Sequence, residues 1–394
     1  MIVLYRHRRR EKSMKILITT DLFTVKTNGV VTSVRNLYDE LIRNGHEVRI
    51  LTLSENKRSR KEGPVYYIRS VSLEKVYPNV RMPTSFRHRL IRELIAWKPD
   101  VIHSQCEFFT FQYALRISKL TGAPIVHTYH TLYEQYVPYV FKSRRLGKRI
   151  VRDMSRKRLK RVERVIAPTH KVEAALRGYG VENPISVVPS GISLEQHRMR
   201  ISEAERVERR RSLGIGDDRF VLINLGRLGT EKNLDELLRF FAAALPVHPN
   251  LVFLIVGDGP AKGALEQLSV ELGIENNVVF TGMVDPKQVQ CYYQMGDVFV
   301  SASTSETQGL TYVEAAANGL PLLCREDPCL QDVLIPGENG YPYTTQTEFI
   351  YALTAMTGDP QWRKAAGGKS REIADSFDKG TFGNSVEMIY AGMV

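Results

Sequence analysis

Short apolar runs typical of buried strands alternate with amphipathic helical patterns along the whole chain of 394 residues. The first run, residues 15–20, is followed by Val30, Val34 and Leu41 at helical spacing, and residues 46–52 form the next run. Repeated strand–helix–strand units favour parallel pairing, because each crossover helix returns the chain to the same edge of a sheet. The sequence therefore predicts an α/β protein built on doubly wound parallel sheets.

The alternation forms two series of similar size. A charged, polar stretch at residues 196–219 separates them and predicts a linker or a peripheral helix. We expect a basic N-terminal extension at residues 1–13, a first Rossmann-like lobe at 14–200 and a second at 201–394, with the C-terminal helix a candidate to pack back on the first lobe. Two facing lobes predict a cleft at the carboxyl ends of their strands. The expected strands are residues 15–20, 46–52, 101–103, 125–128, 165–167 and 185–188 in the first lobe, and 220–225, 251–256, 278–281, 297–302 and 321–324 in the second.

The net charge of +12 is divided unequally between the two halves. Residues 1–200 contain 39 Lys and Arg against 17 Asp and Glu, whereas residues 201–394 contain 16 against 26, so the halves carry +22 and −10. A reversal of sign at the midpoint indicates that the halves meet different partners. The basic half is expected to bind something anionic, either a membrane surface or nucleic acid.

Residues 1–13 do not have the order of a secretory signal, because their short apolar run precedes the charges instead of following them. They are either a dispensable basic tail or the product of an early start codon, or they add attraction to a membrane. The four cysteines form no C-x-x-C pair, which predicts reduced thiols in a cytoplasmic protein. The longest apolar runs are far shorter than the roughly 18 residues of a membrane-spanning helix, so any membrane association should be peripheral, on the inner face of the cell membrane.

The strongest local signal is the segment 305–314, where a predicted strand passes through a polar turn into a helix that begins near Leu310. Backbone N–H groups at such a helix start can bind a phosphate. Glu306 in the turn and Glu314 in the helix can accept hydrogen bonds from sugar or ribose hydroxyls. The alternative is a helix-capping Glu and a surface Glu with no ligand.

Two further turns in the second half point to a phosphate ligand. Arg227 and Lys232 lie five residues apart after the first strand of this half, and this spacing suits a diphosphate. Gly257 ends the next strand, either as a simple turn or as a close backbone approach to a ligand. In the first half, Asn28-Gly29 precedes a helix and His130 follows a strand. Each is either a structural residue, such as a helix cap, or part of the ligand site in the cleft.

Together these segments resemble the retaining glycosyltransferases of family 4, which have the GT-B fold of two facing Rossmann-like lobes. The resemblance covers residues 14–394. It implies catalytic roles for His130, beside the transferred sugar, and for Glu306, on the sugar hydroxyls. It also implies a set of residues that bind the donor, through its diphosphate, its ribose, its base or a loop that approaches it. These residues are Gly29, Arg227, Lys232, Gly257, Val284, Gln308, Gly309, Leu310, Thr311 and Glu314.

A basic helix adjoins these motifs at residues 142–164. It contains 12 Lys and Arg against two acids, with an apolar strip that includes Leu146 and Ile150. This pattern suits an anionic membrane surface, and the alternative is a solvated face. The side chains expected to bind anionic lipids are Arg149, Arg152, Arg156 and Lys160. Residues 77–86 add exposed-looking Tyr77, Val80, Met82 and Phe86.

The segments SETQGLT (305–311) and HTYHTLYEQY (127–136) resemble those of the bacterial diacylglycerol glucosyltransferases. The resemblance implies UDP-glucose as the nucleotide-sugar donor, diacylglycerol as the acceptor and an α linkage. It also implies a front-face transfer that needs neither a cofactor nor a metal. Two alternatives stay open: transfer to phosphatidylinositol or a soluble acceptor from another nucleotide sugar, and a nucleic-acid-binding protein, which would carry recognition elements not seen here.

Overall fold

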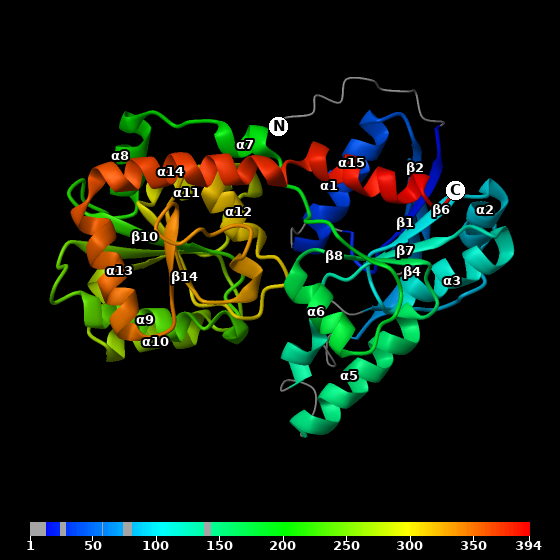
Figure 1. Cartoon of the computed structure of the whole chain (residues 1–394), viewed down its shortest axis with the longest axis horizontal. Coiled ribbons are helices and arrows are strands. Elements are labelled where there is room, and N and C mark those ends of the chain that lie inside the picture. The colour runs from blue at the N-terminus through cyan, green and yellow to red at the C-terminus, as the bar shows by residue number, and fades with distance from the viewer. Residues whose placement is uncertain (1–12, 24–28, 57, 74–80, 138–142) are drawn as a thin grey trace.

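The computed structural model describes residues 13–23, 29–56, 58–73, 81–137 and 143–394, which fold into two α/β lobes side by side (Figure 1). The first lobe contains a nine-stranded sheet in the order β3-β4-β2-β1-β6-β7-β8-β9, with β5 paired to β4. Its strands are β1 (Lys15–Thr19), β2 (Glu47–Ser54), β3 (Arg60–Glu62), β4 (Val65–Ser72), β5 (Arg81–Pro83), β6 (Val101–Ser104), β7 (Ile125–Thr128), β8 (Arg164–Ala167) and β9 (Ile185–Val187).

The second lobe contains a six-stranded sheet in the order β12-β11-β10-β13-β14-β15, and every pairing in it is parallel. Its strands are β10 (Phe220–Leu225), β11 (Leu251–Val256), β12 (Val278–Phe280), β13 (Val298–Ser301), β14 (Leu322–Arg325) and β15 (Gly340–Tyr343). All six residues of β11 are buried, as expected for a central strand with helices on both faces. The predicted fold of two facing parallel-sheet lobes is confirmed.

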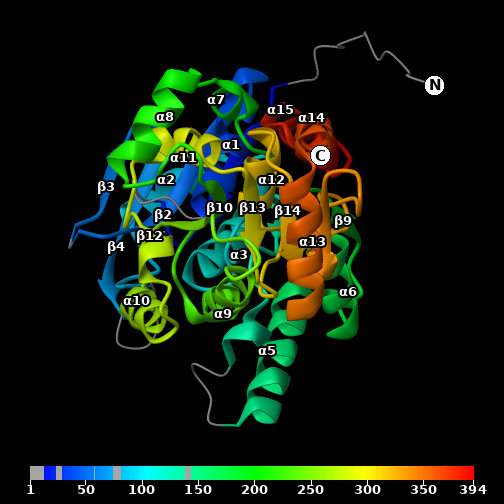
Figure 2. The ribbon, with the colours of Figure 1, turned by 90° about the vertical axis from the view of Figure 1, so that its left-hand side faces the viewer.

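Helices cover both faces of each sheet (Figures 1 and 2). Those of the first lobe are α1 (Gly29–Arg43), α2 (Arg89–Trp97), α3 (Phe109–Thr121), α5 (Arg144–Leu159) and α6 (His170–Gly178). Those that follow along the chain are α7 (Leu194–Arg198), α8 (Glu203–Ser212), α9 (Leu234–Ala244), α10 (Lys262–Glu271), α11 (Val289–Met295), α12 (Leu310–Ala317), α13 (Gln346–Gly358), α14 (Pro360–Ala374) and α15 (Lys379–Ala391). None of these helices has both the length and the apolar character needed to cross a membrane.

The chain passes between the lobes twice, and the two passages lie against each other. Val188 packs in the core of the first lobe and Ile192 in that of the second, so the first passage precedes the expected boundary at residue 200. The second passage leads into α15, which packs on α1 and contributes Phe382, Val386 and Tyr390 to the first lobe's core. The C-terminal helix therefore belongs structurally to the first lobe (Figure 1).

Strand β4 and the two short strands paired with it, β3 and β5, lie at one edge of the first sheet and were not anticipated from the sequence. All three residues of β3 are charged, β5 consists of Arg81, Met82 and Pro83, and each of the two strands pairs antiparallel with β4. Their stability comes from pairing with β4, which is not visible in a local hydrophobic pattern. The N-terminal extension, residues 1–12, and Asn28, Tyr77 and Val80 lie outside the described residues, whereas Met82 and Phe86 are each 40% exposed, as expected.

Close packing of α15 on α1 predicts a specific destabilising substitution. In Gly383→Ala the added methyl would lie 2.6 Å from Cβ of Glu40, which is buried in α1. We expect the free energy of unfolding to fall by about 1–3 kcal/mol, the usual cost of overpacking, as measured by denaturant titration. Gly368→Ala in α14 is the matched control, because a methyl there meets no atom within 4 Å and a helix gains up to about 1 kcal/mol from Gly to Ala. Equal stability of the two variants would contradict the packing argument.

Candidate active site

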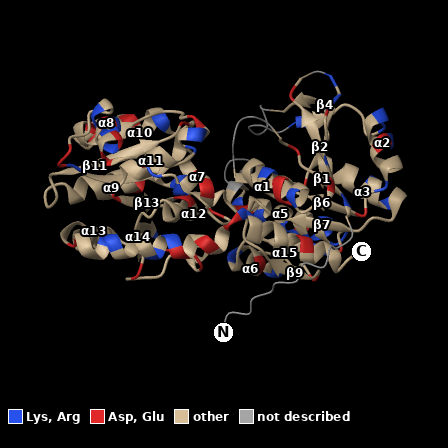
Figure 3. Ribbon diagram, turned by 90° about the horizontal axis from the view of Figure 1, so that it is seen from above, with Lys and Arg blue, Asp and Glu red and all other residues tan. Residues whose placement is uncertain are grey.

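Loops from the carboxyl ends of both sheets meet where the lobes face each other. The N-terminal ends of α1 and α12 approach across this boundary: a Cβ on Gly29 would lie 3.8 Å from Cδ1 of Leu310 (Figure 3). His130 follows β7 in the first lobe, and Glu306 follows β13 in the second. The hydroxyl of Thr307 donates to the carbonyl of His130 over 2.9 Å. The structure thus brings the two predicted catalytic residues to the same junction from different lobes.

Glu306 lies in the turn between β13 and α12, and its carboxylate pairs with the ammonium of Lys232 at 2.5 Å. Gly309 ends this turn with a φ of +72°, where a Cβ would lie 2.4 Å from the ring of Tyr312. Only glycine fits this conformation and space. Gly309, Leu310 and Thr311 stand at the start of α12, so the predicted helix start near Leu310 is confirmed, and the binding of an anion by its backbone N–H groups stays a prediction.

Arg227 precedes the short 3₁₀ turn 230–232 that follows β10 and Lys232 is its last residue, but each already has a carboxylate partner. The side chain of Arg227 is about half exposed and its guanidinium pairs with Glu231, and Lys232 pairs with Glu306. Glu231 was not predicted as a site residue, because the sequence around it is typical of an ordinary charged turn. A bound diphosphate would compete with these two carboxylates for the cations.

Gly257 is required by contact between two loops. Its φ is +132°, and a Cβ would lie 1.9 Å from the carbonyl oxygen of Gly226. Its N–H donates to the carbonyl of Gly282 at 3.1 Å, which brings the loop before Val284 against the end of β11. The loops that end β10, β11 and β12 therefore converge, and Val284 stands two residues beyond this convergence.

Glu314 lies in α12 and accepts a hydrogen bond of 2.9 Å from the hydroxyl of Tyr293. Burial raises the pKa of Glu314 to about 7, and the hydrogen bond from Tyr293 opposes this shift. The carboxyl group is thus near its titration midpoint at neutral pH. Tyr293 was missed in the sequence because its role depends on the reach of its side chain from α11 to Glu314 in α12.

His130 is neutral at physiological pH, since burial lowers the pKa of its imidazole to about 4. Its Nε2 lies 2.6 Å from Oε1 of Gln105, and an amide oxygen only accepts hydrogen bonds. With the amide of Gln105 in this orientation, the proton is on Nε2, which leaves Nδ1 as an acceptor. Nε2 of Gln105 is buried with no hydrogen-bond partner among the described residues. Gln105 follows β6 at the same sheet edge, which is the signal that could have revealed it.

Gln308 was expected to bind the donor, but its side-chain amide is used elsewhere. Its oxygen accepts from the N–H of Ser190 and its nitrogen donates to the carbonyl of Ser190, both at 2.8 Å. The side chain is buried and holds the passage between the lobes. The side chain therefore fixes the turn before α12 to the passage between the lobes, a relation that sequence spacing cannot reveal.

The basic helix α5 projects from the first lobe (Figure 2). Its inner strip consists of Gly147, Val151, Ser155 and Leu159, all buried. Arg149, Arg156 and Lys160 are exposed on the other side, together with Leu146 and Ile150, which are 57% and 42% exposed. Arg152 is also exposed, but it pairs with Glu134 at 2.5 Å, and Asp153 pairs with Arg156.

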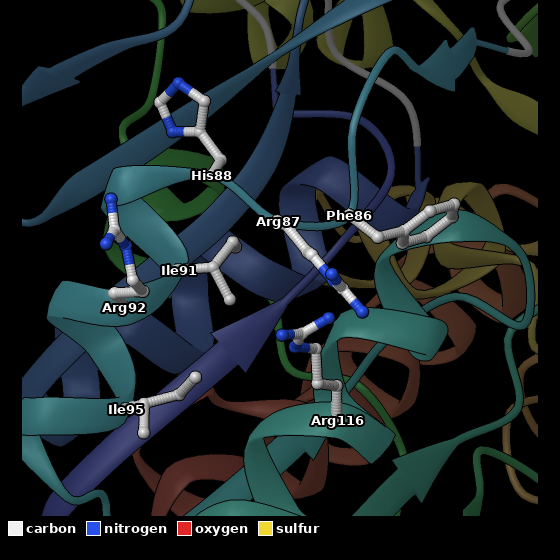
Figure 4. Close-up of a pocket in the computed structure, with 7 residues that line it drawn as sticks. All are labelled: Phe86, Arg87, His88, Ile91, Arg92, Ile95 and Arg116. Carbon is white, nitrogen blue, oxygen red and sulfur yellow. The ribbon is translucent and has the colours of Figure 1, made fainter.

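A separate hollow of about 320 Å³ opens between α2 and α3 on the first lobe (Figure 4). The side chains of Arg87 and Arg116 point toward each other there. None of the predicted site residues lines this hollow, so it lies apart from the junction. Its lining residues are Phe86, Arg87, His88, Ile91, Arg92, Ile95 and Arg116.

Comparison with known proteins identifies the family. Residues 27–196 match the model described as Glycosyltransferase Family 4, and residues 205–372 match Glycosyl transferases group 1. An alpha-monoglucosyldiacylglycerol synthase of Streptococcus pneumoniae is 34% identical over 88% of this chain and 79% of its own length. The chain belongs to glycosyltransferase family 4. This assignment decides for an enzyme over a nucleic-acid-binding module.

Two further comparisons extend over nearly the whole chain. An alpha-monoglucosyldiacylglycerol synthase of Acholeplasma laidlawii is 30% identical over 97% of this chain and 98% of its own length. Alr3699/HepE of Anabaena, solved in complex with UDP and glucose, superposes with a TM-score of 0.76 over 96% of this chain and 100% of its own, at 18% identity. The GT-B fold of this glycosyltransferase is therefore shown along its length.

The position of Glu306 predicts a large loss of activity on its removal. In Glu306→Ala the lost hydrogen bonds of the carboxylate, each worth about 1.5–3 kcal/mol, should lower kcat at least about tenfold without unfolding the chain. Turnover of nucleotide sugar and circular dichroism measure the two effects. The control is Glu326→Ala, which removes an exposed carboxylate after the neighbouring strand β14. A folded Glu306→Ala variant with near wild-type turnover would refute the role.

Donor affinity is predicted to depend on pH through Glu314. Because the pKa is raised to about 7, the fraction of carboxylate, the form that accepts hydrogen bonds from a ribose, rises about tenfold from pH 6 to pH 8. Calorimetry with UDP-glucose, whose phosphates do not titrate in this range, should show tighter binding at the higher pH. Glu314→Gln should bind equally at both pH values. An unchanged pH dependence in that variant would assign the effect to another group.

Proposed function

We propose that this glycosyltransferase transfers glucose from UDP-glucose to the free hydroxyl of diacylglycerol, with retention of the α configuration. The observation that carries the proposal is the identity of 30–34% to two proteins named alpha-monoglucosyldiacylglycerol synthase, over 88–97% of this chain. Placement of His130 and Glu306 at one interlobe junction supports transfer at that point. The basic, partly apolar surface of α5 supports a lipid acceptor.

Donor binding would rearrange two ion pairs. The diphosphate would take Arg227 and Lys232 from Glu231 and Glu306, with the backbone N–H groups at the start of α12 as further donors. This exchange would release the carboxylate of Glu306 to accept hydrogen bonds from the glucose hydroxyls. Glu314 would accept hydrogen bonds from the ribose. The same cations would stabilise the charge that develops on the leaving diphosphate.

The transfer would occur on the front face of the sugar. The acceptor hydroxyl attacks the anomeric carbon from the side on which the bond to the diphosphate breaks, and a leaving oxygen takes the proton. Neutral His130 would present Nδ1 to a sugar hydroxyl while Gln105 holds its ring in orientation. Because Arg227 and Lys232 supply the positive charge, transfer should persist in a metal chelator.

The proposal is tested by offering the purified protein a panel of labelled nucleotide sugars with diacylglycerol in anionic vesicles. We expect UDP-glucose to be used and the product to be an α-glucosyl diacylglycerol, identified by mass and by its anomeric coupling constant. Parallel reactions contain phosphatidylinositol vesicles or soluble sugars in place of diacylglycerol. Preferential transfer to either of these acceptors would overturn the proposed one.

Membrane binding is predicted to depend on the outward face of α5. Each basic side chain near an anionic surface contributes about 1 kcal/mol, screened over about 8 Å at physiological salt. Reversal of Arg149, Arg156 and Lys160 to Glu should release the protein from anionic vesicles and lower transfer to lipid, while calorimetry shows unchanged binding of UDP-glucose. Co-sedimentation should rise with anionic lipid content and fall with added salt.

The matched control reverses three exposed basic residues of the second lobe, Arg211, Arg239 and Lys364, and so changes the net charge equally. This control should still bind the vesicles. Equal loss in both variants would mean that total charge, and not the face of α5, attracts the membrane. Equal binding of the native protein to neutral vesicles would also contradict the prediction.

A further inference from the structure

Lys171 of the first lobe reaches across the boundary to the turn that contains Glu306. It lies in the first turn of α6, and its side chain is 13% exposed. Its ammonium contacts the carbonyl oxygens of Thr304 and Glu306, both at 2.9 Å, and the carboxylate of Asp327 at 2.7 and 2.8 Å. All three N–H donors of the ammonium therefore have acceptors in the second lobe.

The location of Lys171 is unfavourable for the helix that carries it. A cation in the first turn is repelled by the positive end of the helix dipole. This cost is offset only when the second lobe supplies the acceptors. If α15 is counted with the first lobe, on which it packs, Lys171–Asp327 is the one ion pair among the described residues that joins the two lobes. The contact of Lys171 therefore stabilises the junction between the lobes and not the helix α6 itself.

The segment that Lys171 binds is also held by three neighbouring contacts. The hydroxyl of Thr169 donates to the carbonyl of Thr307 at 2.6 Å, that of Thr307 donates to the carbonyl of His130, and Gln135 donates to the carbonyl of Thr304. These contacts are between neutral groups. Among the described residues of the first lobe, Lys171 is the one that brings a charge to this segment, and it binds the peptide carbonyl of Glu306 itself.

We propose that Lys171 is a positioning residue for glycosyl transfer: it fixes the backbone of the Glu306 turn when the lobes are together, so that the carboxylate of Glu306 is placed correctly only in the closed enzyme. This inference rests on the proposed role of Glu306 toward the donor sugar. Asp327, 6% exposed, neutralises the buried ammonium and also caps the turn at residues 328–330 by accepting from the N–H of Cys329. The nucleotide-binding groups Arg227, Lys232 and Glu314 are all in the second lobe and do not touch Lys171.

The test compares Lys171→Met with His170→Ala, its neighbour in the same turn. His170 is exposed, and its imidazole pairs with Glu173 in the same helix. For Lys171→Met we expect kcat for UDP-glucose turnover to fall about tenfold or more, the size of effect from a lost charged hydrogen bond, while affinity for UDP stays within about twofold. His170→Ala should leave both values unchanged, and Lys171→Arg should recover part of the lost kcat.

A second measurement needs no acceptor and so separates this inference from the choice of lipid. Hydrogen exchange is followed in the peptide 304–310 with saturating UDP. Lys171→Met should accelerate exchange in this peptide, whereas His170→Ala and Glu306→Ala should not reproduce that change. Unchanged exchange and unchanged kcat in folded Lys171→Met would overturn the inference. Near wild-type turnover by Glu306→Ala would instead contradict the proposed role of Glu306, on which this inference rests.

The double variant Lys171→Asp with Asp327→Lys distinguishes positioning from simple attraction between the lobes. It restores an ion pair of reversed direction, but an aspartate cannot donate to the carbonyls of Thr304 and Glu306. We expect kcat to remain low in this variant. Recovery of wild-type kcat would show that the ion pair only joins the lobes, and the positioning role would be refuted.

Discussion

The arrangement of this enzyme depends on the hydrogen bonds between the two segments that join its lobes. The N–H of Ile192 donates to the carbonyl of Phe377 at 2.9 Å, and the N–H of Lys379 donates to the carbonyl of Ile192 at 3.0 Å. Gly191 permits this approach, because a Cβ there would lie 2.6 Å from Cα of Lys379. The two passages therefore behave as one short, paired connection. Any change in the angle between the lobes must bend both of them together.

Helix α1 and the turn before α12 both bind this connection. Ser33 and Asn36 of α1 donate to Ser190 and to the carbonyl of Gly191, and Gln308 makes two hydrogen bonds to the backbone of Ser190. The connection is thus in direct contact with the turn that precedes α12 and, through it, with the start of the helix. The proposed site and the joint between the lobes are therefore in contact, and a change in the angle between the lobes would act directly on the turn that contains Glu306 and Gln308.

The sequence allowed the parallel core and the site motifs to be predicted because their signals are local. The strands expected at 220–225 and 251–256 coincide with β10 and β11, whose buried runs are continuous. The edge strands β3 and β5 and the Gly- and Pro-containing β15 have no such run. Lys232 and Glu306 were each singled out, but their pairing was not, and Lys171 and Asp327 are 156 residues apart. Contacts between the lobes depend on the relative orientation of the two folded sheets, and a local sequence pattern does not predict that orientation.

The return of α15 to the first lobe has a consequence for the order in which this protein forms during synthesis. Phe382, Val386 and Tyr390 fill a core whose other members include Ile16 and Leu37, near the opposite end of the chain. Domains generally acquire structure as they emerge from the ribosome, N-terminal part first. Here the first lobe leaves the ribosome early but lacks one wall of its core until residues 379–391 have followed the whole second lobe out of the exit tunnel. Until α15 has been synthesised, the nascent first lobe therefore exposes the apolar surface that Phe382, Val386 and Tyr390 cover in the folded protein.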